Sequence, residues 1–307
     1  MLNWLVIGIG DITTRRVIPA ILAETRSRLY GLVTRDPQKA AAYPSASVWT
    51  QLAPALEDPA VDIVYVASPV ALHAPQTIAA LRAAKHVLCE KPVAMNYPEA
   101  LSIAEVAAQS RGICGVSYYR RLFPKLIRAK ELVAVGTIGQ PVLAEANTHG
   151  WLDITNRDWL IDPTMAGGGP LYDTASHRID AFNFLFGRPV RATGMRANVV
   201  HKLDVEDAAT VLVEYENNLR GIVDVRWNTH LRRDQFRITG TDGEIDLGPL
   251  SGPSIRCNGH EEDLACHANT HYPLVEDFAT AVLEHRPPVC PIEEGIRTDW
   301  VTSEVML

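Results

Sequence analysis

Short apolar runs alternate with helix-forming segments through the first 117 residues, and this alternation restricts the fold more than any other feature of the chain. Helices are predicted between the apolar runs, for example at residues 74–84 and 98–109. A strand-helix repeat of roughly 20–30 residues predicts parallel strands with right-handed crossovers, and so a doubly wound α/β sheet. The predicted buried strands are residues 2–7, 29–34, 62–67, 86–89 and 113–117.

The conspicuous residues of this half all follow the carboxyl ends of predicted strands. In open α/β sheets, ligands bind outside the carboxyl ends of the strands. Unrelated surface loops would not place so many unusual residues at one edge, so we expect a ligand site there. The residues are Gly8 and Gly10, Thr34 and Arg35, Ser68 and Pro69, Glu90 and Lys91, and Tyr118 and Tyr119.

The first strand end carries the sequence Gly8-Ile9-Gly10-Asp11-Ile12-Thr13. Glycines in this spacing allow a tight turn and let a pyrophosphate approach the backbone, while the helix N-terminus behind them attracts an anion. We therefore expect Gly8, Gly10, Asp11 and Ile12 to contact a dinucleotide. Thr13 stands where the motif has glycine or alanine, and the alternative is a tight strand-to-helix turn without a ligand.

The end of the second strand indicates which dinucleotide binds. Thr34-Arg35-Asp36 lies about 20 residues beyond the glycines, where NAD-binding chains place an acidic residue on the ribose. An arginine and a hydroxyl suit a 2′-phosphate instead, so Thr34 and Arg35 favour NADP. Asp36 keeps NAD open, and the alternative for Arg35 is a solvated loop residue.

A proline ends the strand at residues 86–89 and leaves Glu90 and Lys91 just beyond it. Proline cannot donate to a sheet and keeps the preceding residue extended, so Lys91 is expected at the ligand edge. The alternative is a pair of solvated loop charges. We expect Lys91 to meet cofactor and substrate, and Glu90 to orient or screen the lysine.

The strand-helix alternation ends near residue 118, which divides the chain into domains at residues 1–117 and 118–307. Sequential strand-like runs in the second domain predict a large, mostly antiparallel open sheet. One face of this sheet must be covered by helices, and the other is a candidate subunit interface. The predicted strands are residues 191–200, 208–215, 219–228 and 235–239.

Aromatic and charged side chains gather in two segments of the second domain. One segment, residues 119–121, precedes a helix predicted at residues 124–135, and the other is an irregular loop expected at residues 151–165. Flat indoles beside carboxylates suit a sugar ring, although tryptophans also anchor loops. The loop holds Trp151, Asp153, Arg157, Asp158 and Trp159. Substrate contacts are expected from Tyr119, Arg120, Arg121, Trp151 and Trp159.

Three consecutive glycines, Gly167 to Gly169, precede a helix that carries Asp173, His177 and Asp180. Glycines let the backbone pass close to another object, and residues four apart share one face of a helix. A carboxylate one turn from an imidazole can fix its tautomer and tune it as an acid or base. The alternative is a histidine with a structural role.

The composition argues against several classes of function. A net charge of −7 with no basic stripe argues against nucleic-acid binding. No apolar run approaches the ~20 residues of a membrane span. Five scattered cysteines and an N-terminus without a basic leader suggest the cytoplasm. A solvated loop is expected at residues 257–271, because this stretch contains the acidic run Glu261-Glu262-Asp263. A metal site is not expected there, because Cys257, His260, Cys266, His267 and His271 are irregularly spaced.

These motifs together resemble the Gfo/Idh/MocA oxidoreductases over nearly the whole chain. The resemblance implies an N-terminal Rossmann domain for the cofactor and a C-terminal α/β domain whose open sheet forms a homodimer or homotetramer. Contacts to the cofactor would come from Ser68, Pro69, His73, Glu90 and Lys91. The similarity rests on Gly8-Ile9-Gly10, Ala67-Ser68-Pro69 with His73, Glu90-Lys91-Pro92, Arg120-Arg121 with Pro124, and Gly167-Gly168-Gly169 through Leu171, Asp173, His177 and Asp180.

The resemblance also implies roles in catalysis. Lys91 would contact the reacting hydroxyl and the nicotinamide ribose, His177 would exchange the proton, and Asp173 would bind a neighbouring substrate hydroxyl. The Lys91–Pro92 peptide is often cis in such proteins. The chain departs from the family pattern at Val70, where asparagine is common, and at Ala175 and Ser176, where glycine or cysteine is more usual.

We therefore predict a dehydrogenase or reductase that transfers a hydride between NADP, or NAD, and a secondary alcohol or ketone of a sugar, sugar derivative or cyclitol. The alternatives among enzymes are a relative that reduces another carbonyl or an imine, and redox-assisted glycoside cleavage with tightly held NAD. A catalytically silent dinucleotide sensor is the alternative from a different class. The presence of Lys91, Asp173 and His177 argues against such a sensor.

Overall fold

The computed structural model describes residues 1–155 and 158–306, and its chain divides into two compact units. Unit 1 contains residues 1–119 and 267–296, and unit 2 contains residues 120–266 and the chain from residue 297 onward. The sequence-based division into residues 1–117 and 118–307 differs from this one at residues 118–119 and, over a longer stretch, in the segment 267–296. That segment returns to unit 1 because its helix α8 (Tyr272–Glu284) buries Phe278 against the indole of Trp4, with ring centroids 6.0 Å apart.

Unit 1 is built on a six-stranded sheet in the order β3-β2-β1-β4-β5-β6, in which every pair is parallel. The five predicted strands are confirmed, with ends that shift by a residue or two. The strands are β1 (Leu2–Ile7), β2 (Ser27–Val33), β3 (Ser47–Trp49), β4 (Ile63–Val66), β5 (His86–Cys89) and β6 (Cys114–Val116).

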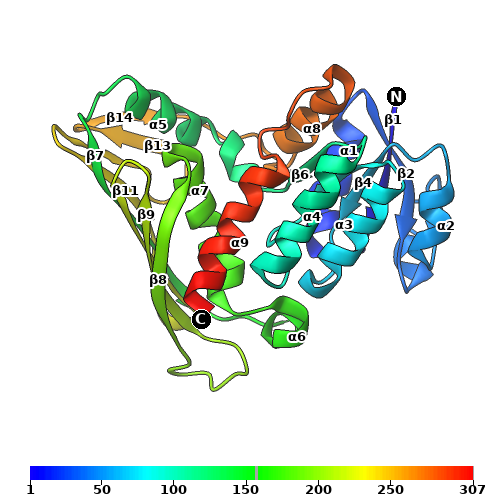
Figure 1. Ribbon diagram of the computed structural model, residues 1–307, viewed down its shortest axis with the longest axis horizontal. Helices are drawn as coiled ribbons and strands as arrows, with labels where there is room; N and C mark the ends of the chain where they lie inside the picture. The colour runs from blue at the N-terminus through cyan, green and yellow to red at the C-terminus, as the bar shows by residue number, and fades with distance from the viewer. Residues whose placement is uncertain (156–157, 307) are drawn as a thin grey trace. The chain divides into compact units, whose positions relative to one another are not determined.

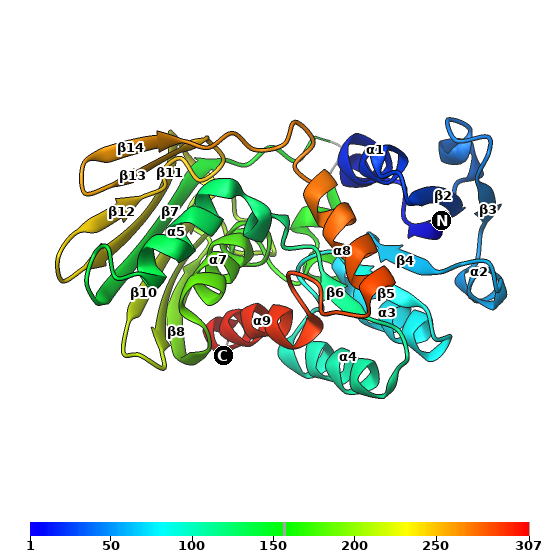
Figure 2. The same ribbon diagram turned by 90° about the horizontal axis from the view of Figure 1, so that it is seen from above.

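The edge strand β3 was not predicted, and helix α2 (Leu52–Glu57) follows it before β4. The three residues of β3, Ser47 to Trp49, are exposed or half-buried and too few to form a recognisable apolar run. Figure 2 shows the sheet of unit 1 between α1 (Ile18–Ala23) and α8 on one side and α3 (His73–Arg82) and α4 (Tyr97–Gln109) on the other. Because strand order reverses between β1 and β4, the carboxyl ends there form the crevice in which doubly wound sheets bind ligands.

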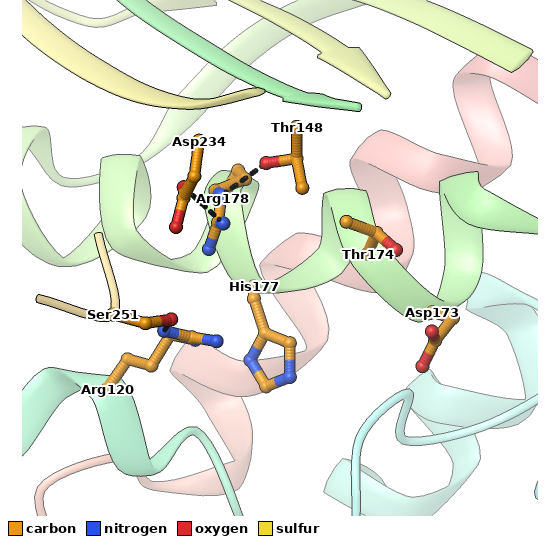
Figure 3. Close-up of a pocket in the computed structure, with 8 residues that line it drawn as sticks. All are labelled: Arg120, Thr148, Asp173, Thr174, His177, Arg178, Asp234 and Ser251. Atoms are coloured by element: carbon orange, nitrogen blue, oxygen red, sulfur yellow. Dashed lines mark hydrogen bonds and ion pairs between the residues drawn. The ribbon is translucent and has the colours of Figure 1, made fainter. Parts of the chain in front are cut away.

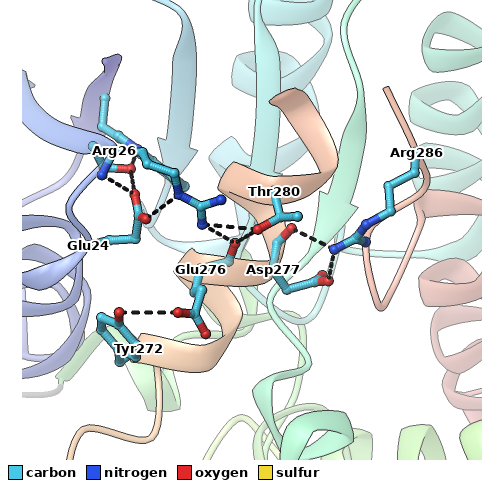
Figure 4. A network of polar contacts seen from close by, with 9 residues as sticks. Glu24, Arg26, Tyr272, Glu276, Asp277, Thr280 and Arg286 are labelled. Atoms are coloured by element: carbon cyan, nitrogen blue, oxygen red, sulfur yellow. Dashed lines mark hydrogen bonds and ion pairs between the residues drawn. The ribbon is translucent and has the colours of Figure 1, made fainter. Parts of the chain in front are cut away.

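Helix α8 is tied to the start of unit 1 by polar contacts as well as by packing (Figure 4). Arg26 donates to the hydroxyl of Thr280 at 3.0 Å and to Glu24 at 2.6 Å. Asp277 accepts from Arg286 at 2.8 Å and from the backbone of Val289 at 2.7 Å. Arg26 thus links α8 to the segment before β2, and Asp277 fixes α8 to the residues that follow it.

Unit 2 is built on an eight-stranded open sheet in the order β14-β13-β12-β11-β7-β10-β9-β8. Its neighbouring strands are antiparallel except β7 and β10, which confirms the mostly antiparallel open sheet predicted from the sequence. The strands are β7 (Pro141–Trp151), β8 (Pro189–Ala197), β9 (Ala208–Tyr215), β10 (Arg220–Arg226), β11 (Asn228–Gly240), β12 (Glu244–Asp246), β13 (Ser254–Cys257) and β14 (His260–Asp263).

The hairpin β13–β14 corrects the first part of the solvated loop predicted at residues 257–271, whereas residues 264–271 lie outside helices and strands. Arg256 and Glu261 face each other across this hairpin and form an ion pair at 3.3 Å. The acidic run that suggested a loop is therefore one edge strand of the sheet, where charged side chains protect against pairing with another chain.

Helices cover one face of the unit 2 sheet, as Figure 1 shows for α5 (Pro124–Ala134) and α7 (Ser176–Phe186). The last helix, α9 (Ile292–Met306), joins this face from Arg297 onward. On β9 the covered side chains are apolar, whereas Leu212 on the opposite face is exposed. The predicted loop at 151–165 contains the short helix α6 (Pro163–Ala166), and Asn156 and Arg157 within it lie outside the described residues. No helix among the described residues is long and apolar enough to cross a membrane.

Candidate functional site

The glycine turn after β1 has the backbone geometry that a dinucleotide needs. Gly8 has a φ of +91°, and a Cβ there would lie 2.7 Å from the carbonyl oxygen of Ala67. Around Gly10, no atom of the described residues other than Gly10 and its two chain neighbours lies within 4 Å of where a Cβ would be. Asp11 and Ile12 then begin a helix, so their amides belong to its N-terminal turn. A pyrophosphate can therefore approach Gly10 and these amides closely.

Thr13 supplies a contact that a third glycine could not make. Its hydroxyl accepts from the amide of Gly10 at 2.8 Å and donates to the carbonyl of the same residue at 2.9 Å. The side chain is fully buried and begins a π-helical segment, Thr13–Val17, which continues into α1. Thr13 thus holds the turn from inside.

The segment after β2 presents an arginine. Asp36 is engaged with its own backbone, because its Oδ1 accepts from the amide of Gln38 at 3.0 Å and caps a short 3₁₀ helix. The hydroxyl of Thr34 bonds to the backbone of Asp36 at 3.2 Å. Arg35 between them is exposed. Arg35 and Asp36 are both exposed in this turn, but one oxygen of the Asp36 carboxylate is engaged by the backbone of the turn.

His73 connects the ends of β4 and β5. Its Nδ1 lies 2.7 Å from the carbonyl oxygen of Pro92, and its Nε2 lies 2.8 Å from that of Ser68. Burial lowers the pKa of this imidazole, and a neutral ring donates to one of the two carbonyls. The hydroxyl of Ser68 donates to Gln76 at 2.7 Å. His73, Ser68 and Pro69 therefore shape the strand ends, and His73 does so from a buried position.

The side chain of Glu90, the residue after β5, is buried among side chains of the neighbouring strands. Its Oε1 accepts from the hydroxyls of Tyr65 at 2.5 Å and Ser117 at 3.2 Å, which lie at neighbouring strands. Burial raises the pKa of this carboxyl group against the lowering effect of its hydrogen bonds. Glu90 thus anchors the segment, whereas the next residue, Lys91, is half-buried and precedes Pro92 through a cis peptide. The cis peptide agrees with the expectation from the family resemblance.

Unit 2 contains a polar cavity of about 360 Å³ on the helix-covered side of its sheet (Figure 3). Its walls come from β7 and β11, from the π-helical segment Leu171–Ala175 and the start of α7, from the 3₁₀ helix Tyr119–Leu122, and from the loop after β12. The lining residues are Arg120, Thr148, Asp173, Thr174, His177, Arg178, Asp234 and Ser251.

The sheet side of the cavity is held by Arg178. Its Nη2 pairs with Asp234 at 2.8 Å, and its Nε donates to the hydroxyl of Thr148 at 2.9 Å. Because this guanidinium is almost fully buried, the pair fixes α7 against β7 and β11. His177, the preceding residue on the helix, then points away from the sheet, as does Asp173 (Figure 3).

A second wall comes from Arg120 and the loop after β12. Arg120 Nη1 donates to the hydroxyl of Ser251 at 3.1 Å. The loop is held from behind by the buried Lys125, whose ammonium donates to the carbonyls of Leu247 at 2.8 Å and Pro249 at 2.6 Å. Burial lowers the pKa of Lys125 to about 8. Side chains of both charges therefore line the cavity, a chemistry that suits a small polyhydroxylated molecule.

The structure brings three of the predicted substrate residues, Arg120, Asp173 and His177, to this cavity. Arg121 does not line it, because its guanidinium is buried in an ion pair with Asp180 at 2.8 Å. Trp151 stacks on His230 with ring centroids 4.0 Å apart and lies outside the lining.

Two further predicted residues lie outside the lining as well. Trp159 is exposed in the segment that precedes α6. Tyr119 belongs to unit 1, where it packs on His271 with ring centroids 4.3 Å apart. The neighbours Arg120 and Arg121 thus differ completely in environment.

Sequence reasoning missed five lining residues, Thr148, Thr174, Arg178, Asp234 and Ser251. Two of them, Thr174 and Arg178, adjoin the predicted Asp173 and His177, so their position in the helix was available as a signal. Thr148 and Asp234 carried none, because they meet only through the antiparallel register of β7 and β11. Among the described residues, no group of three or more His, Cys, Asp or Glu side chains could hold a metal ion.

Comparison with known proteins matches both units. Residues 2–118 match the profile of an oxidoreductase family with an NAD-binding Rossmann fold, and residues 126–246 match the GFO/IDH/MocA C-terminal domain. A 1,5-anhydro-D-fructose reductase of Ensifer adhaerens is 27% identical over 310 residues, which cover 96% of this chain and 92% of the relative. A D-xylose 1-dehydrogenase (NADP+) of Haloarcula marismortui is 28% identical over 260 residues, 80% of this chain and 72% of the relative.

A solved structure shares the fold over nearly its whole length. The structure of levoglucosan dehydrogenase in complex with NADH superposes with a TM-score of 0.91 and 20% sequence identity. The match covers 99% of this chain and 96% of that chain. At this identity the likeness concerns the fold.

Proposed function

The chain belongs to the Gfo/Idh/MocA family of oxidoreductases, and from this premise we propose that it transfers a hydride between NADP and a secondary alcohol or ketone of a sugar, sugar derivative or cyclitol. One observation carries the proposal most directly. Asp173 and His177 line a polar cavity in a chain whose other unit is a dinucleotide-binding fold.

The nicotinamide ring, when bound, accepts or gives the hydride, and the chain must manage the proton of the alcohol. His177 is proposed to take that proton during oxidation and to return it during reduction. Lys91 is proposed to hold the reacting oxygen, and Asp173 to accept from an adjacent hydroxyl. The proposal is supported by the neighbours that hold these residues in place. The Arg178–Asp234 ion pair fixes the helix of His177 against the sheet, and the buried Glu90 immediately precedes Lys91.

A polyhydroxylated substrate is supported by the size and polarity of the cavity. A volume of about 360 Å³ matches a small molecule, and the lining offers carboxylates, hydroxyls and guanidiniums as partners for sugar hydroxyls. The names of the relatives from Ensifer adhaerens and Haloarcula marismortui also describe enzymes of sugar chemistry. Tyr119, Trp151 and Trp159 remain proposed as outer substrate contacts.

NADP is proposed over NAD because of the turn after β2. The carboxylate of Asp36 is engaged in capping, while Arg35 is exposed beside the hydroxyl of Thr34. A guanidinium in this place can pair with a 2′-phosphate, which NAD lacks.

A homodimer or homotetramer through the open face of the unit 2 sheet is also proposed. Exposed apolar side chains on this face include Met195 and Leu212, which alternate with the covered residues of β8 and β9. Light scattering coupled to size exclusion would measure the mass of the assembly. A cytoplasmic location is proposed because an odd number of scattered cysteines suits a reducing compartment.

A 340 nm assay of the purified protein tests the proposed function. NAD and NADP are each combined with a panel of aldoses, sugar acids, anhydrosugars and inositols, in both reaction directions. Turnover with at least one polyol or sugar, faster with NADP, is expected. Tight cofactor binding without turnover of any panel member would favour the silent sensor, and turnover confined to imines or simple ketones would overturn the substrate class.

A further inference from the structure

The helix that carries Asp173 and His177 begins without a side-chain cap of its own. Its first turns are the π-helical segment Leu171–Ala175, which runs directly into α7, and Pro170 precedes them. Pro170 makes no capping hydrogen bond from its side chain. The first amides of a helix have no partner within it and need one elsewhere.

Glu206, just before β9, supplies that partner. Its Oε1 accepts from the amide of Gly169 at 2.8 Å and from the amide of Leu171 at 3.1 Å, although Leu171 lies 35 residues away in the chain. The residue is only 5% exposed. A carboxylate at a helix N-terminus both satisfies orphan amides and interacts favourably with the helix dipole.

Gly169 links this carboxylate to the functional helix. While its amide donates to Glu206, its carbonyl oxygen accepts from the amides of Tyr172 at 3.1 Å and Asp173 at 3.0 Å. A Cβ at Gly169 would lie 2.0 Å from the backbone oxygen of Glu206, so only glycine fits between the two segments. Hydrogen bonds therefore connect Glu206 to Asp173 through the amide and the carbonyl group of Gly169.

We propose that Glu206 is a positioning residue for the reaction, a distant N-cap that fixes where Asp173 and His177 stand in the cavity. The inference rests on the proposed function, because the helix matters for turnover only if these two residues act on the substrate. Loss of the cap frees two amides at the point where the helix starts, and the first turn, which holds Asp173, frays. A misplacement of about 1 Å at a reacting group can cost on the order of 100-fold in rate.

Glu206→Met tests the proposal, because it keeps an unbranched side chain of similar length and removes both acceptor oxygens. Its kcat is expected to fall roughly 10- to 100-fold with less than a threefold rise in KM, since the substrate still binds while its reacting group is misaligned. Glu206→Gln is expected to restore kcat to within about threefold, because an amide oxygen can accept from both amides.

Asp207 provides a matched control. This adjacent, buried carboxylate accepts from the amides of Val199, Val200 and His201 at 2.7 to 3.0 Å and so supports a different segment. Asp207→Asn is expected to lower the melting temperature without the selective loss of kcat. An equal loss of kcat in both variants, or a normal kcat in Glu206→Met, would overturn the proposal.

Hydrogen exchange separates a failure of this inference from a failure of the proposed function. In the variant Glu206→Met, amides 169–175 are expected to exchange faster than in the wild type, a readout that needs no substrate. Faster exchange without measurable activity in the wild type would overturn the proposed function and leave the cap in place. Unchanged exchange would overturn the cap itself. If Glu206→Met does not fold, Glu206→Asp, which draws the oxygens back by one methylene, must show the same loss of kcat and the same faster exchange.

Discussion

Glu90 and Lys91 are adjacent residues whose environments differ. The carboxylate of Glu90 is buried among the hydroxyls of Tyr65 and Ser117, whereas Lys91 stands half-buried at the strand end. An anchored neighbour limits the freedom of the lysine, so that its ammonium can be aimed at little entropic cost.

Lys91→Met is expected to lower turnover by ~10²–10⁴-fold, because it removes the charge proposed to hold the reacting oxygen. The Kd for NADP should change by less than about threefold, as measured by fluorescence titration. Lys85→Met is the control: its ammonium donates to the carbonyls of Asp58 and Val61 at 2.9 Å, so its loss should affect stability and leave kcat intact. Near-normal turnover in Lys91→Met would remove the lysine from the mechanism.

Glu90→Gln is expected to flatten the pH dependence of stability. Burial raises the pKa of Glu90 in the folded state above its pKa in the unfolded chain. Between these two pKa values the folded state binds more protons, so the free energy of unfolding falls as the pH rises. Gln mimics the neutral carboxyl and removes this loss. Thermal melts from pH 4.5 to 8 measure the effect. The melting temperature at pH 7 should stay within about 4 °C of the wild type or exceed it, and an unchanged pH slope would contradict the assignment.

At the scale of elements, two connections are held from within by single side chains. The hydroxyl of Thr13 hydrogen-bonds to both the amide and the carbonyl group of Gly10 and so holds the turn between β1 and the helical segment that follows it. The ammonium of Lys125 on α5 holds the loop that carries Ser251 into the cavity. Both connections precede or border the candidate ligand sites, so their loss should affect binding as well as stability.

Thr13→Val removes the hydroxyl while keeping the shape of the side chain. The amide and carbonyl of Gly10 then lose a buried partner, which costs ~1 kcal/mol or more and weakens NADP binding by an expected three- to tenfold. Isothermal titration measures that affinity. Thr14→Val is the control, since Thr14 also donates to Gly10 O at 2.9 Å but is exposed to solvent, and its effect should be much smaller. Equal effects of the two variants would contradict the role of the buried hydroxyl.

Lys125→Met is expected to change how stability depends on alkaline pH. The folded-state pKa of Lys125 is about 8, below its ordinary value of 10.5, so the unfolded chain binds more protons between these values. The unfolding free energy contributed by this residue therefore rises with pH across that window, by at most ~3 kcal/mol. Urea unfolding of both proteins at pH 7.5 and 10 measures it. A difference between variant and wild type that does not change with pH would show that the lysine titrates normally.

At the scale of the whole molecule, the chain leaves unit 1 at residue 119 and returns to it for residues 267–296. The returning segment completes the core of unit 1, since Cys290, Ile292 and Ile296 pack with residues of β5 and β6. The stability of the dinucleotide-binding unit thus depends on residues far beyond it in the sequence.

Phe278→Ala is expected to destabilise unit 1 by ~3–5 kcal/mol, because a fully buried ring on α8 is removed from its contact with Trp4. Hydrogen exchange should accelerate in β1 and β6. Phe236→Ala is the matched control, as this ring is equally buried but lies in β11 of unit 2. Faster exchange confined to unit 2 in both variants would contradict the placement of α8.

The sequence by itself determined the parallel sheet, the open antiparallel sheet, and the helix that carries Asp173 and His177. These features follow from short-range chemistry: apolar periodicity marks strands and helices, and glycine and proline act on the backbone within a few residues. The strand-end pattern also identified Gly8, Gly10 and Lys91 in their observed places at the carboxyl edge.

Only the tertiary structure decided which side chain faces a cavity and which is buried. Arg120 lines the cavity, while Arg121 pairs with Asp180, 59 residues away. Thr148 and Asp234 meet through strand register, and Glu206 reaches the start of a helix across 35 residues. Such contacts depend on how elements distant in sequence pack. Two chemically identical residues such as Arg120 and Arg121 then differ in role, because an arginine that becomes buried must pair with a carboxylate to offset the cost of losing water.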